Sequence, residues 1–298
     1  MDWLTLARTW TRHAPFGRGK DRLAALALGL SHEPPTDVVC ETTDGRRLFV
    51  DPASHSYGPV YFKGTYEPGV TSVVTQLLRP GDVCLDVGAN IGWYTTLCAT
   101  LVGPTGSVHA FEPLLATFRQ LERNVGLLAD ASHVHLNCHA LGDTSGAGVL
   151  HVFPGVPDGH TSLADFGRTD AAAHDCAVTT VDEYLAAHQV GEVTFVKLDI
   201  EGAELQCLRG AGRLFAQPTP PLWIVEMALA TSRGFNYLPD DLVAHMRAHG
   251  DFEFFAIGES DGALTPIDGF APGDPGAYVL CAPRAHHRDR LAAALERR

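Results

Sequence analysis

Four acidic residues lie at the ends of short apolar segments, where a carboxylate is costly to bury unless it has a task. Asp86, Glu112, Asp199 and Glu226 lie at the ends of residues 83–87, 107–111, 193–198 and 222–225. Apolar segments of this length are typical of strands buried in a parallel sheet, and ligands bind beyond the carboxyl ends of such strands. We therefore predict that these four carboxylates surround one site.

The segment Gly-Ala-Asn-Ile-Gly-Trp at residues 88–93 connects the first of these strands to a helix-like stretch. A strand, a glycine turn and a helix open a nucleotide-binding α/β sheet. A dinucleotide fingerprint needs further glycines at its third and sixth positions, which are Asn90 and Trp93 here. Asp86 would repel a phosphate and suits a cation. S-adenosylmethionine, with an adenosine, an ammonium and a sulfonium but no phosphate, fits this turn, and an NAD-dependent oxidoreductase is the alternative enzyme.

Two further acids fit the nucleoside part of such a ligand. Glu112 lies after the second strand, where an acid accepts hydrogen bonds from both ribose hydroxyls. The alternative role for Glu112 is a cap on the following helix. Asp143 lies just past the third strand and can accept the adenine amino group, although a turn-forming role suits it nearly as well.

Lys197, Asp199 and Glu201 are spaced by two residues, so along a strand they share one face. Three charges on one face of a central strand are costly unless they are paired or functional. The functional interpretation places Asp199 or Glu201 near the reacting group, and the alternative is a buried Lys–Asp ion pair that orders the sheet. An inactive cofactor-binding partner protein would not need these charges, which disfavours that third possibility.

The composition limits the class of partner. The chain has 298 residues and a net charge of −13 with no basic stripe, which argues against a nucleic-acid surface. Its seven cysteines contain no C-x-x-C pair, as expected of reduced thiols in a cytoplasmic protein. No apolar run approaches the ~20 residues of a membrane span, and the first residues lack the apolar core of a secretory signal. We expect a cytoplasmic protein that contacts neither membrane nor nucleic acid, and no motif specifies an oligomeric state.

The hydrophobic pattern predicts the elements that position these residues. Two short helices with a break at residues 15–17 fill residues 1–30, a Pro34-Pro35 linker follows, and residues 37–63 resemble β-hairpin material. Predicted strands are 83–87, 107–111, 134–141, 193–200, 222–225, 252–257 and 277–282, and predicted helices are 70–78, 93–101, 114–129, 181–188, 203–215, 238–249 and 289–298. This alternation predicts an α/β fold, a mainly parallel seven-stranded sheet with helices on both faces. The predicted domains are an N-terminal helical and β-hairpin cap over residues 1–69 and a Rossmann-like domain over residues 70–298, with an insertion at about 142–177.

Several motifs together resemble the FkbM family of S-adenosylmethionine-dependent methyltransferases, of the Rossmann-like class I. The resemblance covers about residues 60–230 and is most specific where the glycine turn is combined with Lys-x-Asp-Ile-Glu-Gly-x-Glu. The motifs are residues 63–68 (Lys-Gly-Thr-Tyr-Glu-Pro), 80–82 (Pro-Gly-Asp), 85–94, 110–113 (Ala-Phe-Glu-Pro), Asn124, 140–143 (Ala-Leu-Gly-Asp), 180–183 (Thr-Val-Asp-Glu) and 196–204 (Val-Lys-Leu-Asp-Ile-Glu-Gly-Ala-Glu).

The resemblance implies O-methylation of a small molecule, a sugar or a secondary metabolite such as an antibiotic or polyketide. It also implies a set of cofactor-binding residues. These are Asp86, Gly88, Asn90, Gly92 and Glu112, with Tyr66 and Glu67 closing over the cofactor.

An alcohol is a poor nucleophile until its proton is removed, so a base or a metal should lie beside it. Asp199 is the leading candidate, followed by Glu226, Glu201 and His160, with Lys197 in the same charged group. His160 lies in the predicted insertion, where an acceptor pocket could form, although a lone loop histidine is more often simply exposed.

Metal binding is the alternative to a base. Asp199 and Glu226 could share Mg²⁺, which prefers oxygen ligands, but the sequence offers no third ligand. His133, His135 and His139 alternate along the third strand without a Cys or carboxylate partner and are interpreted as structural. No motif identifies the acceptor.

Overall fold

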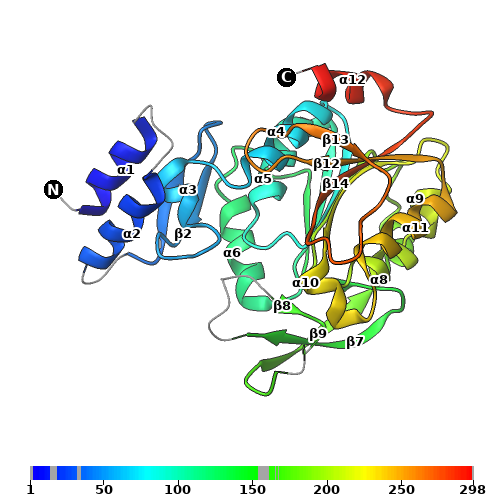
Figure 1. The fold of residues 1–298 in the computed structure, drawn as a ribbon, viewed down its shortest axis with the longest axis horizontal. Helices are drawn as coiled ribbons and strands as arrows, with labels where there is room; N and C mark the ends of the chain where they lie inside the picture. Colours follow the sequence, from blue (N-terminus) through cyan, green and yellow to red (C-terminus); the bar gives the residue numbers. More distant parts are fainter. Residues whose placement is uncertain are drawn as a thin grey trace.

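A central mixed sheet organises the chain, in a computed structural model that describes residues 3–13, 19–31, 35–153, 161–164, 166 and 168–296 (Figure 1). The sheet has eight strands in the order β13-β12-β14-β11-β10-β3-β4-β5. Their bounds are β3 (Val83–Val87), β4 (Ser107–Phe111), β5 (Val134–Asn137), β10 (Phe195–Leu198), β11 (Leu222–Ala228), β12 (Phe252–Ile257), β13 (Leu264–Ile267) and β14 (Gly276–Pro283). The strands from β11 to β5 are parallel, and β14 runs antiparallel between β11 and β12.

Alternating apolar side chains bury both faces of this sheet. In β3, Cys84 belongs to one hydrophobic core and Leu85 to the other. The first core contains α4 (Pro68–Leu77), α5 (Trp93–Val102) and α12 (Arg288–Glu296); the second contains α7 (Val181–Ala187), α8 (Glu204–Arg209), α9 (Gly212–Phe215) and α11 (Pro239–His249). Helix α6 (Leu115–Val125) forms a smaller third core with Ala89 and Ala110. The predicted α/β fold with helices on both faces is confirmed.

The N-terminal region attaches to the start of α5. It contains α1 (Trp3–His13), α2 (Lys20–Leu30), the hairpin β1 (Val38–Glu41) and β2 (Arg47–Val50), and α3 (Gly58–Lys63). Buried Arg46 donates hydrogen bonds to the Trp93 carbonyl and to Thr96 Oγ1, each of 2.7 Å, and stacks on the Trp93 ring. The predicted hairpin and helices are confirmed, whereas residues 58–63 form a helix rather than a strand because Pro59 starts it and left-handed Gly64 ends it. The predicted break at residues 15–17 lies outside the described residues, as does Pro34.

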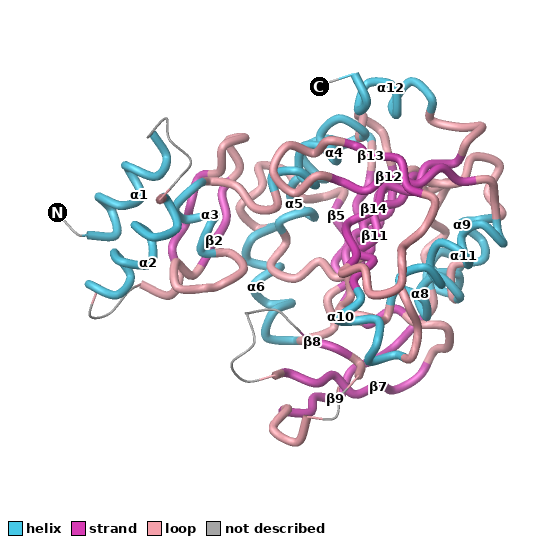
Figure 2. Tube along the Cα trace, viewed as in Figure 1, coloured by secondary structure: helices cyan, strands magenta, loops and turns pink. Residues whose placement is uncertain are grey.

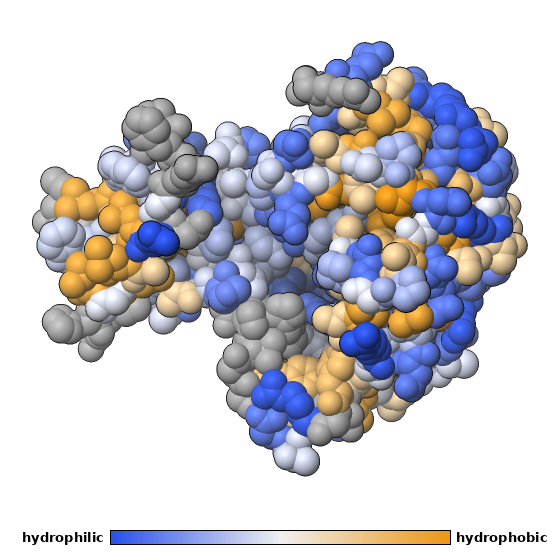
Figure 3. Space-filling view, in the orientation of Figure 1, coloured by the Kyte–Doolittle hydropathy of each residue, from blue (hydrophilic) through white to orange (hydrophobic). Residues whose placement is uncertain are grey.

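An apolar surface distinguishes the outer side of α1 and α2, seen as orange patches at the left of Figure 3. Trp3, Leu6, Trp10, Leu26 and Leu30 are each at least 41% exposed there. Within the described part of the chain, no helix is long and apolar enough to cross a membrane.

A second, four-stranded sheet lies beside the carboxyl ends of the central strands, at the bottom of Figures 1 and 2. Its order is β6-β9-β7-β8, with β6 (Ala140–Leu141), β7 (Gly146–Val152), β8 (Thr161–Ser162) and β9 (Ala172–Thr179). The predicted insertion is therefore largely β structure. The predicted strand over residues 134–141 is two strands in different sheets, because β6 pairs with β9 rather than with β4.

Three other predictions needed correction. The central sheet has eight strands instead of seven, because β13 adds an edge strand that contains Pro266, a residue tolerated only at edges. The predicted helix 203–215 is two helices, α8 and α9, separated at Gly210, where a Cβ would lie 2.1 Å from the Gly142 carbonyl oxygen. Strand β10 ends at Leu198, two residues earlier than predicted.

Candidate active site

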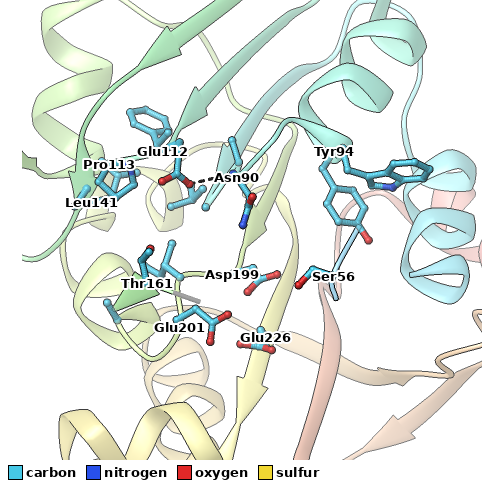
Figure 4. Close-up of a pocket in the computed structure, with 18 of the residues that line it drawn as sticks. Ser56, Asn90, Tyr94, Glu112, Pro113, Leu141, Thr161, Asp199, Glu201 and Glu226 are labelled. Carbon is cyan, nitrogen blue, oxygen red and sulfur yellow. Dashed lines mark hydrogen bonds between the residues drawn. The ribbon is translucent and has the colours of Figure 1, made fainter. Parts of the chain in front are cut away.

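A pocket of about 250 Å³ opens at the carboxyl ends of β3, β4, β10 and β11. The N-terminal cap, the small sheet and β14 supply its remaining walls. The lining residues are Ser56, Tyr57, Tyr66, Glu67, Val87, Gly88, Ala89, Asn90, Trp93, Tyr94, Phe111, Glu112, Pro113, His139, Ala140, Leu141, Leu150, Thr161, Leu163, Asp199, Ile200, Glu201, Ala203, Glu226 and Tyr278. Figure 4 shows Glu112 beside Asn90 at one end, and Asp199, Glu201 and Glu226 grouped at the other.

The glycine turn brings β3 and β10 into contact. Gly88 has a φ of 86°, and a Cβ there would lie only 1.7 Å from the Asp199 carbonyl oxygen. The amides of Gly88 and Ala89 both donate to the Phe111 carbonyl, at 3.0 and 2.9 Å, which ties the turn to the end of β4. Only glycine allows this approach, so the turn sets the spacing between the two ends of the pocket.

Glu112 is held by backbone donors at the end of the pocket nearest β4. Its Oε2 accepts from the Asn90 amide at 3.1 Å and its Oε1 from the Leu114 amide at 2.9 Å. Burial raises the pKa of Glu112 to about 7, even though both hydrogen bonds favour the charged form. The predicted cap ahead of α6 is therefore present, and Glu112 also lines the pocket, where its contact with a ribose stays a prediction.

Polar side chains from four neighbouring strands share the sheet face that packs against α4 and α5. Lys197 is the register partner of Asp86, and Glu226 is the partner of Tyr278. Asp86 lies beneath the pocket rather than in its wall and accepts a hydrogen bond from Thr95 Oγ1. Burial raises the pKa of Asp86 to about 6.

Lys197 and Tyr278 hold Asp199 in place. Lys197 Nζ lies 2.9 Å from Asp199 Oδ2, and the Tyr278 hydroxyl lies 2.7 Å from the same oxygen. Burial lowers the pKa of Lys197, but the negative charges of Asp199 and Glu67 outweigh this and raise it overall. The predicted buried ion pair is therefore present, and its carboxylate also faces the pocket.

Glu67 extends this network from the start of α4. The Tyr94 hydroxyl donates to Glu67 Oε2 at 2.6 Å, and the Tyr278 hydroxyl lies 2.8 Å from Glu67 Oε1. A single Tyr278 proton thus serves two carboxylates, Glu67 and Asp199. Burial raises the pKa of Glu67, the Lys197 charge opposes this, and the Asp199 charge adds to it.

Glu226 differs from these carboxylates because one of its oxygens has no partner. Among the described residues, nothing hydrogen-bonds its Oε2, which is shielded from solvent. Burial, followed by the charges of Asp199 and Glu201, raises the pKa of Glu226 well above its ordinary value. Such an oxygen in a pocket wall is a position at which a ligand, an ion or a water can bind.

The turn after β10 positions Glu201. Glu201 does not share a strand face with Lys197 and Asp199 as predicted. Strand β10 ends at Leu198, and Glu201 adopts a left-handed φ of 54°. Glu204 fixes this turn by accepting from the amides of Ile200 and Gly202 at 2.9 and 3.2 Å and from the Tyr237 hydroxyl at 2.8 Å. Burial raises the pKa of Glu204 to about 7.

Most of the predicted site residues lie in the pocket wall. The residues that line it are Tyr66, Glu67, Gly88, Asn90, Glu112, Asp199, Glu201 and Glu226. Lys197 and Asp86 lie beneath the wall, and Gly92 shapes the turn without lining the pocket. Asp143 is exposed and hydrogen-bonds Thr144 instead of facing the pocket. His160 lies outside the described residues.

Several pocket residues had not been predicted from the sequence. Ser56 and Tyr57 come from the cap, Thr161 and Leu163 from the small sheet, and Tyr278 from β14. His139, interpreted as structural, also lines the pocket. The sequence contains one indication of Tyr278, because its phenol lies within the apolar stretch Ala-Tyr-Val-Leu-Cys-Ala at residues 277–282. In the part of the chain that the structure describes, no group of three His, Cys, Asp or Glu residues is arranged to hold a metal ion, so the Asp199–Glu226 hypothesis still lacks a third ligand.

Comparison with known proteins identifies the family. The model of the methyltransferase FkbM domain matches residues 86–252, more than half of the chain. The 31-O-demethyl-FK506 methyltransferase FkbM of Streptomyces tacrolimicus is 29% identical over 213 residues, which cover 62% of this chain and 76% of that protein. The hexuronic acid methyltransferase AglP of Haloferax volcanii is 29% identical over 146 residues, 48% of this chain and 56% of that protein.

Solved structures are only distantly similar. A SAM-dependent O-methyltransferase from Thermotoga maritima aligns over 86% of this chain and 96% of its own, at 13% identity and a TM-score of 0.38. A score this low supports no argument about activity. The family match is sufficient by itself: the chain belongs to the FkbM family of S-adenosylmethionine-dependent methyltransferases, which decides against the NAD-dependent oxidoreductase.

Proposed function

We propose that this FkbM-family methyltransferase methylates a hydroxyl oxygen of a small molecule. The observation that carries the proposal is a single pocket with a ribose-type carboxylate, Glu112, at one end and the Lys197–Asp199 pair at the other. The name of the Streptomyces relative describes a 31-O-demethyl substrate, which supports oxygen as the acceptor atom. The acidic lining of the pocket favours a small acceptor over nucleic acid.

The residues at the ribose end fit S-adenosylmethionine. Glu112 presents a buried carboxylate whose oxygens can each accept a further hydrogen bond, as two neighbouring ribose hydroxyls require. Gly88 and Asn90 also line the pocket, and Asn90 lies beside Glu112. The cofactor, when bound, supplies an activated methyl group on a positively charged sulfur.

Asp199 is the base in this proposal. As an acceptor hydroxyl forms its new bond to carbon, its oxygen becomes positive and its proton becomes strongly acidic. The Asp199 carboxylate, which Lys197 and Tyr278 hold in the pocket wall, takes that proton. Lys197 then acts as a positioning residue, because its ammonium contacts Asp199 and does not line the pocket.

Calorimetric titration with S-adenosylhomocysteine tests the cofactor assignment, with NADH as the control ligand. Micromolar binding of S-adenosylhomocysteine alone, followed by methyl transfer to a member of a hydroxylated metabolite screen, is the expected result. Binding without any turnover, with and without Mg²⁺, would favour an inactive partner protein. Turnover that requires Mg²⁺ would instead support the hypothesis that Asp199 and Glu226 bind a metal, and it would contradict Asp199 as the base.

A further inference from the structure

Asp199 and Glu226 are neighbouring carboxyl groups on adjacent parallel strands. The register of β10 and β11 pairs Leu198 with Val225, and Asp199 and Glu226 are the next residues along the two segments. Both line the pocket, and Figure 4 shows them beside each other at the end away from Glu112, which we call the acceptor end. Two ionised carboxylates this close repel each other, so unequal surroundings leave one ionised and the other protonated.

Asp199 has the cation and the hydroxyl donor at this end of the pocket. Its Oδ2 lies 2.9 Å from Lys197 Nζ and 2.7 Å from the Tyr278 hydroxyl. Lys197 is buried, so its ammonium group needs this counter-charge. Tyr278 is the register partner of Glu226 on β14, yet its hydroxyl contacts Asp199 and Glu67 instead. Both groups that could stabilise a second carboxylate are therefore already engaged.

Glu226 has no such stabilisation from the described residues. Its Oε2 is shielded from solvent and makes no hydrogen bond to any of them. A carboxylate shares its charge between both oxygens, so a shielded oxygen without a donor makes the ionised form costly. Burial, followed by the charges of Asp199 and Glu201, raises the pKa of Glu226 well above its ordinary value. The titratable groups that face it are Lys197, Asp199, Glu201, Glu204, Tyr237 and Tyr278. The protonated form of Glu226 is thus favoured at neutral pH.

We propose that Glu226 is a carboxylic acid that donates a hydrogen bond to an uncharged oxygen of the acceptor, on the carbon next to the reacting hydroxyl. This inference rests on the proposed function, since it deepens the acceptor class of the same pocket. A protonated carboxyl group has one O–H donor, whereas the Asp199 carboxylate only accepts. The two groups therefore take opposite parts, with Asp199 accepting the proton of the reacting hydroxyl.

The acceptor class that suits this pair is a vicinal diol or an α-hydroxy ketone. Neighbouring strands lie about 4.8 Å apart, a spacing that lets two carboxyl groups reach two oxygens on adjacent carbons. An ammonium group at the second position has no lone pair and cannot accept from Glu226. Glu226 thereby selects for oxygen at the carbon beside the methylated one.

Infrared difference spectroscopy tests the protonation of Glu226 without any acceptor. The unaltered protein is compared with Glu226→Gln at pH 7, and the difference should contain the C=O stretch of a carboxylic acid. Glu112 and Glu204, whose pKa values are also raised by burial, are present in both proteins and cancel. Glu122→Gln, at an exposed position, is the control and should remove carboxylate bands instead. Loss of carboxylate bands in Glu226→Gln would overturn the inference.

Turnover of the acceptor found in the hydroxylated metabolite screen tests the hydrogen bond itself. Glu226→Leu keeps most of the bulk of the side chain but loses the donor, so kcat/KM should fall about tenfold. Glu226→Gln should rescue most of that loss, because its amide nitrogen also donates. Asp199→Asn is the matched comparison, since an amide cannot replace a base. Equal losses in Glu226→Gln and Glu226→Leu would overturn the inference and indicate a base or a metal ligand at this position.

The acceptor identified in the screen gives a third test. We expect it to carry a hydroxyl, ether or carbonyl oxygen on the carbon next to the methylated hydroxyl. An acceptor with only hydrogen or an ammonium group at that carbon would overturn the acceptor class. Failure of the proposed function has a different signature, because S-adenosylhomocysteine would then not bind, whatever the infrared spectrum of Glu226→Gln showed.

Discussion

The two ends of the pocket are built in different ways. At the ribose end, Glu112 is held by the backbone amides of Leu114 and Asn90, which lie 2 and 22 residues away in sequence. At the acceptor end, side chains hold one another, and Tyr278 reaches Asp199 and Glu67 across 79 and 211 residues. Backbone contacts survive most substitutions, whereas a side-chain network changes with each one. Under the proposed function, we expect cofactor binding to be the robust property and acceptor chemistry the adjustable one.

The strongest test of this contrast removes the proposed base. Asp199→Asn keeps the size of the side chain but cannot take a proton, so kcat should fall by about 10²–10⁴-fold. Affinity for S-adenosylhomocysteine should change by less than about fivefold, because Asp199 lies at the other end of the pocket. Steady-state kinetics and calorimetry measure the two effects. Near-normal turnover would remove Asp199 from the mechanism.

Glu112→Ala should show the reverse pattern. It deletes hydrogen bonds to a charged group, and the loss of one such bond costs about 1.5–3 kcal/mol, so cofactor affinity should fall by at least roughly 10- to 100-fold. With saturating cofactor, kcat should remain within a small factor of normal. Glu122→Ala, at an exposed position on α6, is the control and should leave affinity unchanged. Unchanged affinity in Glu112→Ala would reject the ribose assignment.

Tyr278→Phe probes the long-range network with a smaller expected effect. The ring stays in place, but Asp199 and Glu67 lose the hydroxyl that they share. We expect kcat to fall about 5- to 20-fold with little change in cofactor affinity. Tyr94→Phe removes a donor to Glu67 only, so its effect on kcat should be weaker. A larger fall in kcat for Tyr94→Phe would indicate that Glu67, rather than Asp199, is the base.

The last prediction concerns the pH dependence of the free energy of unfolding, which should affect activity least. Glu112 and Glu204 have pKa values raised from 4.5 to about 7 by burial, so the folded chain binds their protons more tightly than the unfolded chain does. This stabilisation is complete below about pH 4.5 and is lost as the pH rises through about 7. Glu204→Gln should reduce the change in the free energy of unfolding across that pH interval by on the order of 1–3 kcal/mol. Urea unfolding at several pH values measures the free energy of unfolding. If it changes with pH equally in Glu204→Gln and in the unaltered protein, the raised pKa of Glu204 is contradicted.

The sequence was informative where structure depends on neighbours along the chain. The seven predicted strands all appear, as does the glycine turn, because alternation and turn residues act locally. The strand face predicted for Glu201 was wrong because β10 ends before it, at a position that depends on the turn fixed by Glu204. Tyr278 and Ser56 could not be assigned, since only tertiary contacts bring them to the pocket. Strand β13 was missed because its edge position tolerates a proline that a central strand would not.

The insertion of β14 between β11 and β12 affects the order in which the enzyme can be completed during synthesis. A ribosome makes residues 1–252 first, including β3, β10 and the whole segment matched by the family model. Tyr278 is still missing at that stage, as are β14 and all of β12 after Phe252. The nascent chain therefore exposes the open edge of β11 until β14 is translated. Chaperone protection in that interval would act on β11, and a chain truncated before Gly276 would lack both a closed sheet and a complete acceptor site.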